Sequence, residues 1–134
     1  MIALLDTNIL IAGTTAHEVA PDLSDFNDFR VSSLSWHELT TGMHTTGDLS
    51  TYKERAHRLS TLQAIYGEGL AYDDDCVDAY ATIMTRVLQR GGVPKAHPTD
   101  RMIAATALAH ELVVVTRDRA DFAMFEGLVD VVER

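Results

Sequence analysis

The sequence predicts an α/β fold in which a mainly parallel sheet is flanked by helices. Short apolar runs alternate along the chain with longer segments of helical periodicity, a pattern that is typical of this fold class. The run at 112–116 is continuously apolar, as expected of a strand covered on both faces. The first run, 2–5, ends abruptly at Asp6, and ligands of open α/β sheets bind at the carboxyl ends of the strands.

The length and composition indicate one ordered domain, residues 1–134. The chain has 134 residues, of which 46% are hydrophobic, and it shows no long linker or repeat. No run is long enough to span a membrane, and no secretory signal is visible. The single cysteine, Cys76, excludes an intrachain disulfide and a CxxC-type metal site. We therefore expect a cytoplasmic protein in which Cys76 is half-buried.

The net charge of -9 argues against binding of nucleic acid by a broad basic surface. It does not exclude a nucleic-acid substrate. Carboxylates gathered at a metal site count as negative in this sum, but bound cations offset them locally.

Hydrophobic periodicity and capping residues predict the elements of the first half of the chain. These are a helix at 7–15, an acidic loop at 17–28 with room for one short helix, a strand at 29–33, a helix from Ser33 or Ser35 to Gly47, and an amphipathic helix at 49–66. Ser35 and Glu38 have the spacing of a capping box, which alone would explain Glu38.

The second half continues the alternation of strands and helices. Its expected elements are a strand at 70–72, a helix opened by Asp73, Asp74 and Asp75 and ending at Gln89, a helix that starts at Pro98, a strand at 112–116, a short helix and an edge strand at 128–132. Three acids at a helix start favour the helix dipole, so we assign them to capping rather than to metal binding. The alanines after Pro98 predict a central, buried helix.

Four acids fall where one edge of such a sheet would gather them. Asp6 and Asp118 follow strands, Glu38 lies one turn into a helix, and Asp100 lies in the first turn of the buried helix. Clustered carboxylates raise one another's pKa, so the group needs a cation. Oxygen ligands suit Mg²⁺ or Mn²⁺, and such a site can activate water and stabilise a phosphoryl group.

The segments around these acids resemble the motifs of PIN domains, and most closely those of VapC toxin ribonucleases. The matching segments are Leu5-Asp6-Thr7-Asn8, Ser35-x-x-Glu38-Leu39, Asp100-x-x-Ile103-Ala104-Ala105-x-Ala107 and Thr116-x-Asp118-x-x-Asp121-Phe122. The resemblance covers nearly the whole chain in motif order, spacing and length. It implies a PIN-like three-layer sandwich with a central sheet between helices.

The resemblance also implies a divalent-metal-dependent endoribonuclease, the toxin of a type II toxin–antitoxin pair. Such an enzyme cuts RNA, with tRNA or rRNA the family-level expectation, to inhibit translation, and it leaves a 5′-phosphate and a 3′-hydroxyl. Carried over by position, Asp6, Glu38, Asp100 and Asp118 form the acidic quartet. Asp6 and Asp100 match direct ligands of Mg²⁺ or Mn²⁺, with Asp118 as a third, while Glu38 and Asp118 would hold a second cation or position water.

Two supporting residues follow from the same motifs. Thr116 matches the hydroxyl residue that supports the cluster. The family often has Asn where this chain has Asp118, followed by the Asp that is Asp121 here. We favour Asp118 as the fourth acid, and Asp121 remains the alternative.

The resemblance further implies a homodimer and a VapB-like antitoxin that places a basic side chain in the acidic site. Carboxylate–guanidinium pairing is strong and bidentate, which makes that contact physically reasonable. The amphipathic helices between Leu49 and Leu88 are the candidate surface for it, although their apolar faces are equally explained as core.

The remaining polar residues give weaker signals. None of the six histidines forms a known catalytic motif, and only His97, shortly before Asp100, is a candidate neighbour of the site. Arg101, Arg117 and Arg119, together with Lys95, flank the acidic segments. They are candidates for contacts with RNA phosphates or, equally, ordinary solvated charges.

Two alternatives remain at this stage. A phosphoaspartyl protein also uses an Asp at a strand end with Mg²⁺, but the phosphatase type needs a second Asp two residues later, where this chain has Asn8. A catalytically silent PIN-like binding module is the other alternative. The intact set of four acids argues against it.

Overall fold

The computed structural model describes all 134 residues and confirms the α/β fold. Four strands form one sheet in the order β2-β1-β3-β4, and all three pairings are parallel. The strands are β1 (Ile2–Leu5), β2 (Asp28–Arg30), β3 (Val113–Thr116) and β4 (Val131–Glu133). The predicted mainly parallel sheet is therefore confirmed.

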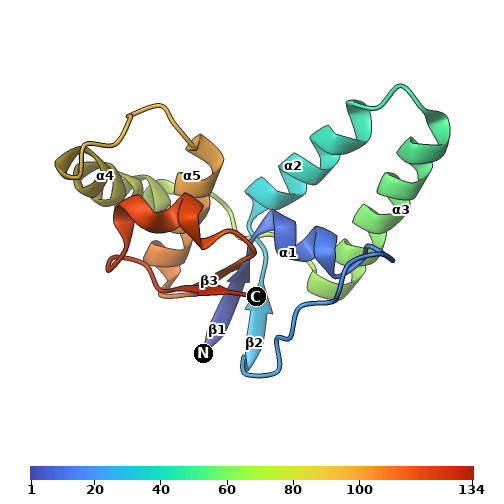
Figure 1. Cartoon of the computed structure of the whole chain (residues 1–134), viewed down its shortest axis with the longest axis horizontal. Helices are drawn as coiled ribbons and strands as arrows, with labels where there is room; N and C mark the ends of the chain where they lie inside the picture. Colours follow the sequence, from blue (N-terminus) through green and yellow to red (C-terminus); the bar gives the residue numbers. More distant parts are fainter.

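Helices cover both faces of this sheet (Figure 1). The helices are α1 (Thr7–Ala12), α2 (Ser33–His44), α3 (Leu49–Tyr66), α4 (Asp74–Gln89), α5 (Pro98–His110) and the 3₁₀ helix η1 (Arg119–Phe125). In Figure 1, α1, α2 and α3 lie on one side of the sheet, while α4, α5 and the red η1 segment lie on the other. No helix combines the length and the hydropathy needed to cross a membrane.

Two hydrophobic clusters hold the three layers together. On β1, Ala3 and Leu5 face the cluster shared with α1, α2 and α3. Leu4, between them, faces the cluster shared with α4, α5 and η1. Successive side chains of a strand point to opposite faces, so a fully apolar β1 is what a sheet covered on both sides requires.

Several predicted elements are confirmed closely. The helix at 49–66 has the predicted bounds, and α4 begins and ends as expected. Asp73 is the N-cap of α4 and accepts a hydrogen bond from the backbone N–H of Cys76, which confirms a capping role for the first of the three acids. In α5 the predicted small residues Ala104, Ala105 and Ala107 are fully buried.

The start of α2 differs from the prediction. Its N-cap is Ser32, whose hydroxyl accepts a hydrogen bond from the backbone N–H of Leu34. The predicted capping box is wrong, because Ser35 and Glu38 lie inside the helix and both contact Thr7. Glu38 therefore does not cap α2 as the sequence predicts.

Three other segments also differ from the prediction. Helix α1 ends at Ala12 rather than at Thr15, and beyond its end the hydroxyls of Thr14 and Thr15 donate to the carbonyl of Ile11. No helix forms within 17–28. Leu70 makes only an isolated bridge to Ser32 instead of a strand over 70–72.

Four further expectations are corrected in detail. The strand expected at 29–33 is β2, Asp28–Arg30, and the edge strand expected at 128–132 is β4, Val131–Glu133. The short helix after Asp118 is a 3₁₀ helix. Cys76 is fully buried rather than half-buried, since it lies on the inner side of α4.

The strand order changes direction at the centre of the sheet. From β1 the chain continues to β2 on one side, and from β3 it continues to β4 on the other. Strands β1 and β3 pair in parallel, so their carboxyl ends lie at the same edge. That arrangement is the topological switch point at which ligands bind in open α/β sheets.

Candidate active site

Asp6 lies at this switch point and is held there by the backbone. Its N–H donates to the carbonyl of Val115 at 2.9 Å and so continues the ladder between β1 and β3. Its Oδ1 accepts a hydrogen bond of 2.8 Å from the N–H of Thr7, the first residue of α1. The side chain therefore caps the helix and still lies at the end of the strand, with only 5% of the residue exposed.

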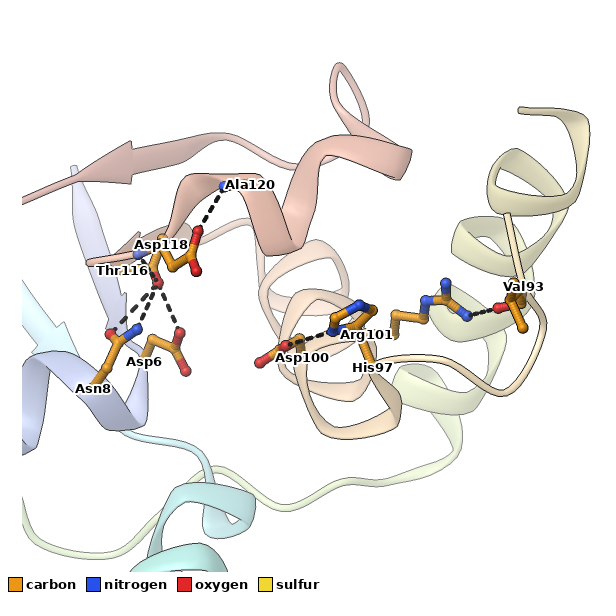
Figure 2. A network of polar contacts seen from close by, with 9 residues as sticks. All are labelled: Asp6, Asn8, Val93, His97, Asp100, Arg101, Thr116, Asp118 and Ala120. Atoms are coloured by element: carbon orange, nitrogen blue, oxygen red, sulfur yellow. Dashed lines mark hydrogen bonds and ion pairs between the residues drawn. The ribbon is translucent and has the colours of Figure 1, made fainter. Parts of the chain in front are cut away.

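The hydroxyl of Thr116 joins the ends of the two central strands (Figure 2). It donates to Oδ2 of Asp6 at 2.8 Å and accepts from Nδ2 of Asn8 at 3.2 Å and from the N–H of Asp118 at 3.1 Å. Oδ1 of Asn8 in turn accepts from the N–H of Arg117 at 3.1 Å. Thr116 is fully buried, so this network fixes the position of the Asp6 carboxylate. The structure thus gives Thr116 a supporting place beside the acids.

Glu38 reaches the same edge from α2. The hydroxyl of Thr7 donates to Oε1 of Glu38 at 2.8 Å, and the hydroxyls of Thr7 and Ser35 lie 2.9 Å apart. Because a hydroxyl has one proton, Ser35 donates to Thr7 when Thr7 donates to Glu38. Desolvation raises the pKa of Glu38, the hydrogen bond from Thr7 opposes that change, and the nearby charge of Asp6 adds to it.

Asp100 approaches from the first turn of α5, and Figure 2 shows its carboxylate directed toward Asp6. Desolvation, followed by the negative charges of Asp6, Asp121 and Glu38, raises the pKa of Asp100 to about 6. His97 acts in the opposite direction, with its Nδ1 3.7 Å from Oδ2 of Asp100. Asp6, Glu38 and Asp121 therefore lie close enough to Asp100 for their charges to act on it.

The pKa of Asp6 is also raised. Burial is the main cause, and the hydrogen bonds from Thr116 and Thr7 oppose it. The negative charges of Asp121 and then Asp118 raise it further. Asp6 is therefore a buried carboxyl group in a field of other carboxylates, an arrangement that disfavours its own ionisation.

The two acids that follow β3 have different surroundings. Asp118 is exposed, and its Oδ1 accepts a hydrogen bond of 3.2 Å from the N–H of Ala120 at the start of η1. Asp121 is half-buried, and its carboxylate groups with Asp100 and His97, with one donor atom from each residue within 4.8 Å of the others. The charges of both acids raise the pKa of Asp6, but of the two only Asp121 also raises the pKa of Asp100.

Arg101 is placed where it cannot contact a substrate. It is only 2% exposed, and its Nη1 donates to the carbonyls of Val93 at 2.7 Å and Pro94 at 3.1 Å. The expectation that Arg101 contacts RNA is therefore contradicted. The guanidinium instead fixes the loop that leads into α5, and Figure 2 shows it pointing away from Asp100.

Arg117 and Arg119 have protein partners as well. Nη2 of Arg117 donates to the carbonyl of Val19 at 2.7 Å, so this side chain holds the loop after α1. Nη2 of Arg119 pairs with Oε1 of Glu126 at 3.2 Å, and both residues are exposed. Contact of Arg117 and Arg119 with RNA stays a prediction.

Thr7, Ser35 and Asn8 are polar contributors that sequence reasoning assigned to helix starts only. They orient Glu38 and Thr116 through contacts between segments far apart in the chain. The one signal available in the sequence was a run of hydroxyl and amide side chains directly after Asp6.

The donor set suits a hard divalent cation. It consists of carboxylates, one of which is buried, and burial and mutual repulsion raise the pKa values of Asp6, Glu38 and Asp100. A cation relieves that repulsion, and carboxylate oxygen is a ligand that Mg²⁺ and Mn²⁺ accept. Among these side chains, Asp100 and Asp121 place donor atoms within 4.8 Å of each other, together with His97.

The fold and this site define a class of α/β protein with an acidic centre at the switch point of a parallel sheet. The PIN domain model matches residues 3–127, and the chain belongs to the PIN-domain family. Its relatives include ribonuclease VapC4 of Mycobacterium tuberculosis, which is 32% identical over 123 residues, covering 91% of this chain and 90% of that protein.

Solved structures show the same fold. VapBC-5 of Mycobacterium tuberculosis, a member of the VapBC family of toxin–antitoxin systems, matches with a TM-score of 0.82 and 24% identity over 99% of this chain and 98% of the other. FitAcB of Neisseria gonorrhoeae matches with a TM-score of 0.79 and 26% identity over 99% and 97% of the two chains. The three-layer arrangement implied by the motifs is thereby confirmed.

Proposed function

We propose that this chain, as a single domain over 1–134, is a divalent-metal-dependent endoribonuclease and the toxin of a type II toxin–antitoxin pair. It would hydrolyse phosphodiesters of tRNA or rRNA in the cytoplasm and so inhibit translation. The observation that carries the proposal is the convergence of Asp6, Glu38 and Asp100 at one edge of the sheet, where Asp6 and Glu38 raise the pKa of Asp100. The similarity to ribonuclease VapC4 supports the choice of substrate class.

Asp6 and Asp100 would hold the Mg²⁺ or Mn²⁺ ion in this proposal. When bound, such an ion supplies Lewis-acid stabilisation of the charge that develops on the scissile phosphoryl group. Oε1 of Glu38 accepts a hydrogen bond from the hydroxyl of Thr7. Its other oxygen, Oε2, is assigned to orient the attacking water and to accept its proton. Thr116 keeps the Asp6 carboxylate in position through the 2.8 Å hydrogen bond.

The fourth acid of the site is either Asp118 or Asp121. The contacts favour Asp121 as the ligand that faces Asp100, because Asp121 lies in one donor group with Asp100 and affects its pKa. One carboxylate oxygen of Asp118 accepts a hydrogen bond from the N–H of Ala120. The role of Asp118 as a third metal ligand stays a prediction. Asp118→Asn and Asp121→Asn variants separate the two, because the variant that removes the ligand should weaken metal binding more than the other variant does.

A VapB-like antitoxin and a second copy of the chain are the proposed protein partners. The match to a VapBC toxin–antitoxin structure supports the first. Helices α3 and α4 and their ends, which the sequence proposed as the contact surface, carry four large hydrophobic side chains open to solvent. These are Leu49, Ile65, Val77 and Leu88, with exposures of 67%, 64%, 51% and 55%. Sedimentation of the purified chain, alone and with an antitoxin, tests both assemblies.

Two observations bear on the alternatives. In a phosphoaspartyl phosphatase the residue two after Asp6 would act as an acid, but here Asn8 is occupied by hydrogen bonds to Thr116 and to the N–H of Arg117. A silent binding module would not need mutually repelling carboxylates at one edge, since each one costs stability unless a cation is present.

Cleavage of a structured RNA pool by the purified chain tests the proposal. The pool contains tRNA and rRNA, Mg²⁺ or Mn²⁺ is either added or chelated, and Asp100→Asn is assayed beside the exposed-acid control Asp78→Asn. Cleavage that needs the ion, leaves 5′-phosphate ends, survives in the control and disappears in Asp100→Asn is the expected result. Metal-independent cleavage, or equal cleavage by both variants, would overturn the proposal.

A further inference from the structure

His97 precedes α5, and its side chain pairs with Asp100 instead of capping the helix. It occupies the N-cap site, yet its imidazole makes no capping hydrogen bond to the helix. Its backbone adopts the left-handed conformation, with φ 48° and ψ 51°. A non-glycine residue in that region carries a conformational cost of about 1 kcal/mol or more. The fold therefore places this imidazole at an energetic cost, and capping does not account for it.

The imidazole faces the acidic site. Its Nδ1 lies 3.7 Å from Oδ2 of Asp100, which is longer than a hydrogen bond, and Figure 2 shows the two side chains next to each other. One donor atom from each of His97, Asp100 and Asp121 lies within 4.8 Å of the other two. The His97 side chain is 56% exposed, so it is free to make small adjustments toward an ion.

Nδ1 of His97 and Oδ2 of Asp100 lie farther apart than hydrogen-bond partners, and small side-chain movements would bring them to the spacing of metal ligands. An octahedral ion with bonds of about 2.1 Å places adjacent donors about 3 Å apart and opposite donors about 4 Å apart. The observed separation of 3.7 Å lies between these two values. Slight closure of the 4.8 Å group around a cation would therefore satisfy all three donors.

We propose that His97 is a direct ligand of the metal in this site, with Asp100 and Asp121, and that it biases the site toward Mn²⁺ over Mg²⁺. The inference rests on the proposed metal-dependent function and adds a nitrogen donor to it. Mg²⁺ is bound by oxygen ligands and water, whereas imidazole is a good ligand for first-row transition ions. One nitrogen among carboxylates therefore shifts the preference away from Mg²⁺.

The matched variants are His97→Asn and His110→Asn. Asn tolerates the left-handed conformation, so the backbone at 97 is kept, and its amide oxygen replaces a nitrogen donor with a hard oxygen donor. His110 lies exposed at the other end of α5 and controls for the loss of a histidine from the same helix. Circular dichroism and thermal unfolding check that each variant is folded.

Binding of Mn²⁺ and of Mg²⁺ is measured separately by calorimetry on the metal-free chain, with no RNA present. The ratio of Mn²⁺ to Mg²⁺ affinity should fall about tenfold or more in His97→Asn, because loss of the nitrogen donor weakens binding of Mn²⁺ more than binding of Mg²⁺. The ratio should stay unchanged in His110→Asn. In the unaltered chain, Mn²⁺ should broaden the imidazole NMR signals of His97 before those of His110.

The outcomes separate this inference from the proposed function. If the chain binds both ions and His97→Asn has the same affinity ratio as the control, His97 is not a ligand, while the metal-dependent function stands. If the chain binds neither ion and the imidazole signals do not change, the metal site itself is refuted. An equal fall in the ratio for both variants also refutes the role of His97.

Discussion

Replacement of Asp100 by Asn should stabilise the metal-free protein at alkaline pH. The folded state raises the pKa of this carboxyl group from 3.8 to about 6, chiefly by desolvation and then by the charge of Asp6. The folded protein therefore binds this proton more tightly than the unfolded chain does. The associated stability is complete below about pH 4 and is lost as the pH rises toward and through 6.

The size of the effect follows from the change in pKa. A rise of about 2 units corresponds to about 3 kcal/mol at 1.36 kcal/mol per unit, and the side chain is only 26% exposed, so solvent screening is limited. Asn carries no charge at any pH. At pH 8 the variant should thus be more stable by up to about 3 kcal/mol, and at pH 4 the difference should fall below about 1 kcal/mol.

Urea unfolding in the presence of a chelator at pH 4 and pH 8 measures this difference. Asp78→Asn, which removes an exposed acid from α4, is the control and should show no such pH-dependent gain. Added Mg²⁺ or Mn²⁺ at pH 8 should stabilise the unaltered chain and not Asp100→Asn, because only the former binds the ion. A variant that is less stable at pH 8, or a gain that is the same at both pH values, would refute the reasoning.

Three further substitutions test the surroundings of the site. Thr116→Val removes the hydroxyl that donates to the buried Asp6 and should cost about 1–3 kcal/mol in urea unfolding at pH 7, with Thr116→Ser, which keeps the hydroxyl, losing less. Ser32→Ala removes the N-cap hydrogen bond of α2 to Leu34 and should lower stability by about 1 kcal/mol, and unchanged stability would contradict the assigned cap. Arg101→Met removes a buried guanidinium that holds the loop before α5 and should destabilise the chain by about 1–3 kcal/mol, whereas unchanged stability would contradict its role in holding that loop.

The role of Glu38 shows where a local sequence pattern fails to predict what a residue does. A capping box with Ser35 explained it fully from sequence alone, but the helix begins earlier, at Ser32. The backbone of 31–33 is held by parallel bridging to Leu70, a contact between segments nearly 40 positions apart. Which serine caps α2 depended on that contact and not on the serines themselves.

The choice between Asp118 and Asp121 also depended on the tertiary structure. Both acids follow β3 by a few residues, so sequence spacing gave no decision between them. The 3₁₀ geometry of η1 turns Asp121 inward toward Asp100 and leaves Asp118 at the start of the helix. Arg101 is a similar case, because its neighbour in sequence is an acid of the site while its side chain lies on the buried side of α5.

The sequence by itself determined the succession of strands and helices, the bounds of α3, the buried alanine helix α5 and the acids at the strand ends. These features depend on hydrophobic periodicity and on residues close to one another in the chain, and both are local properties. The tertiary structure alone decided how the carboxylates are oriented, through contacts such as that of Thr116 with Asp6 across 110 positions. It also placed His97 beside Asp100 and buried Arg101, because burial and the partners of a side chain depend on the packing of distant segments that no local pattern encodes.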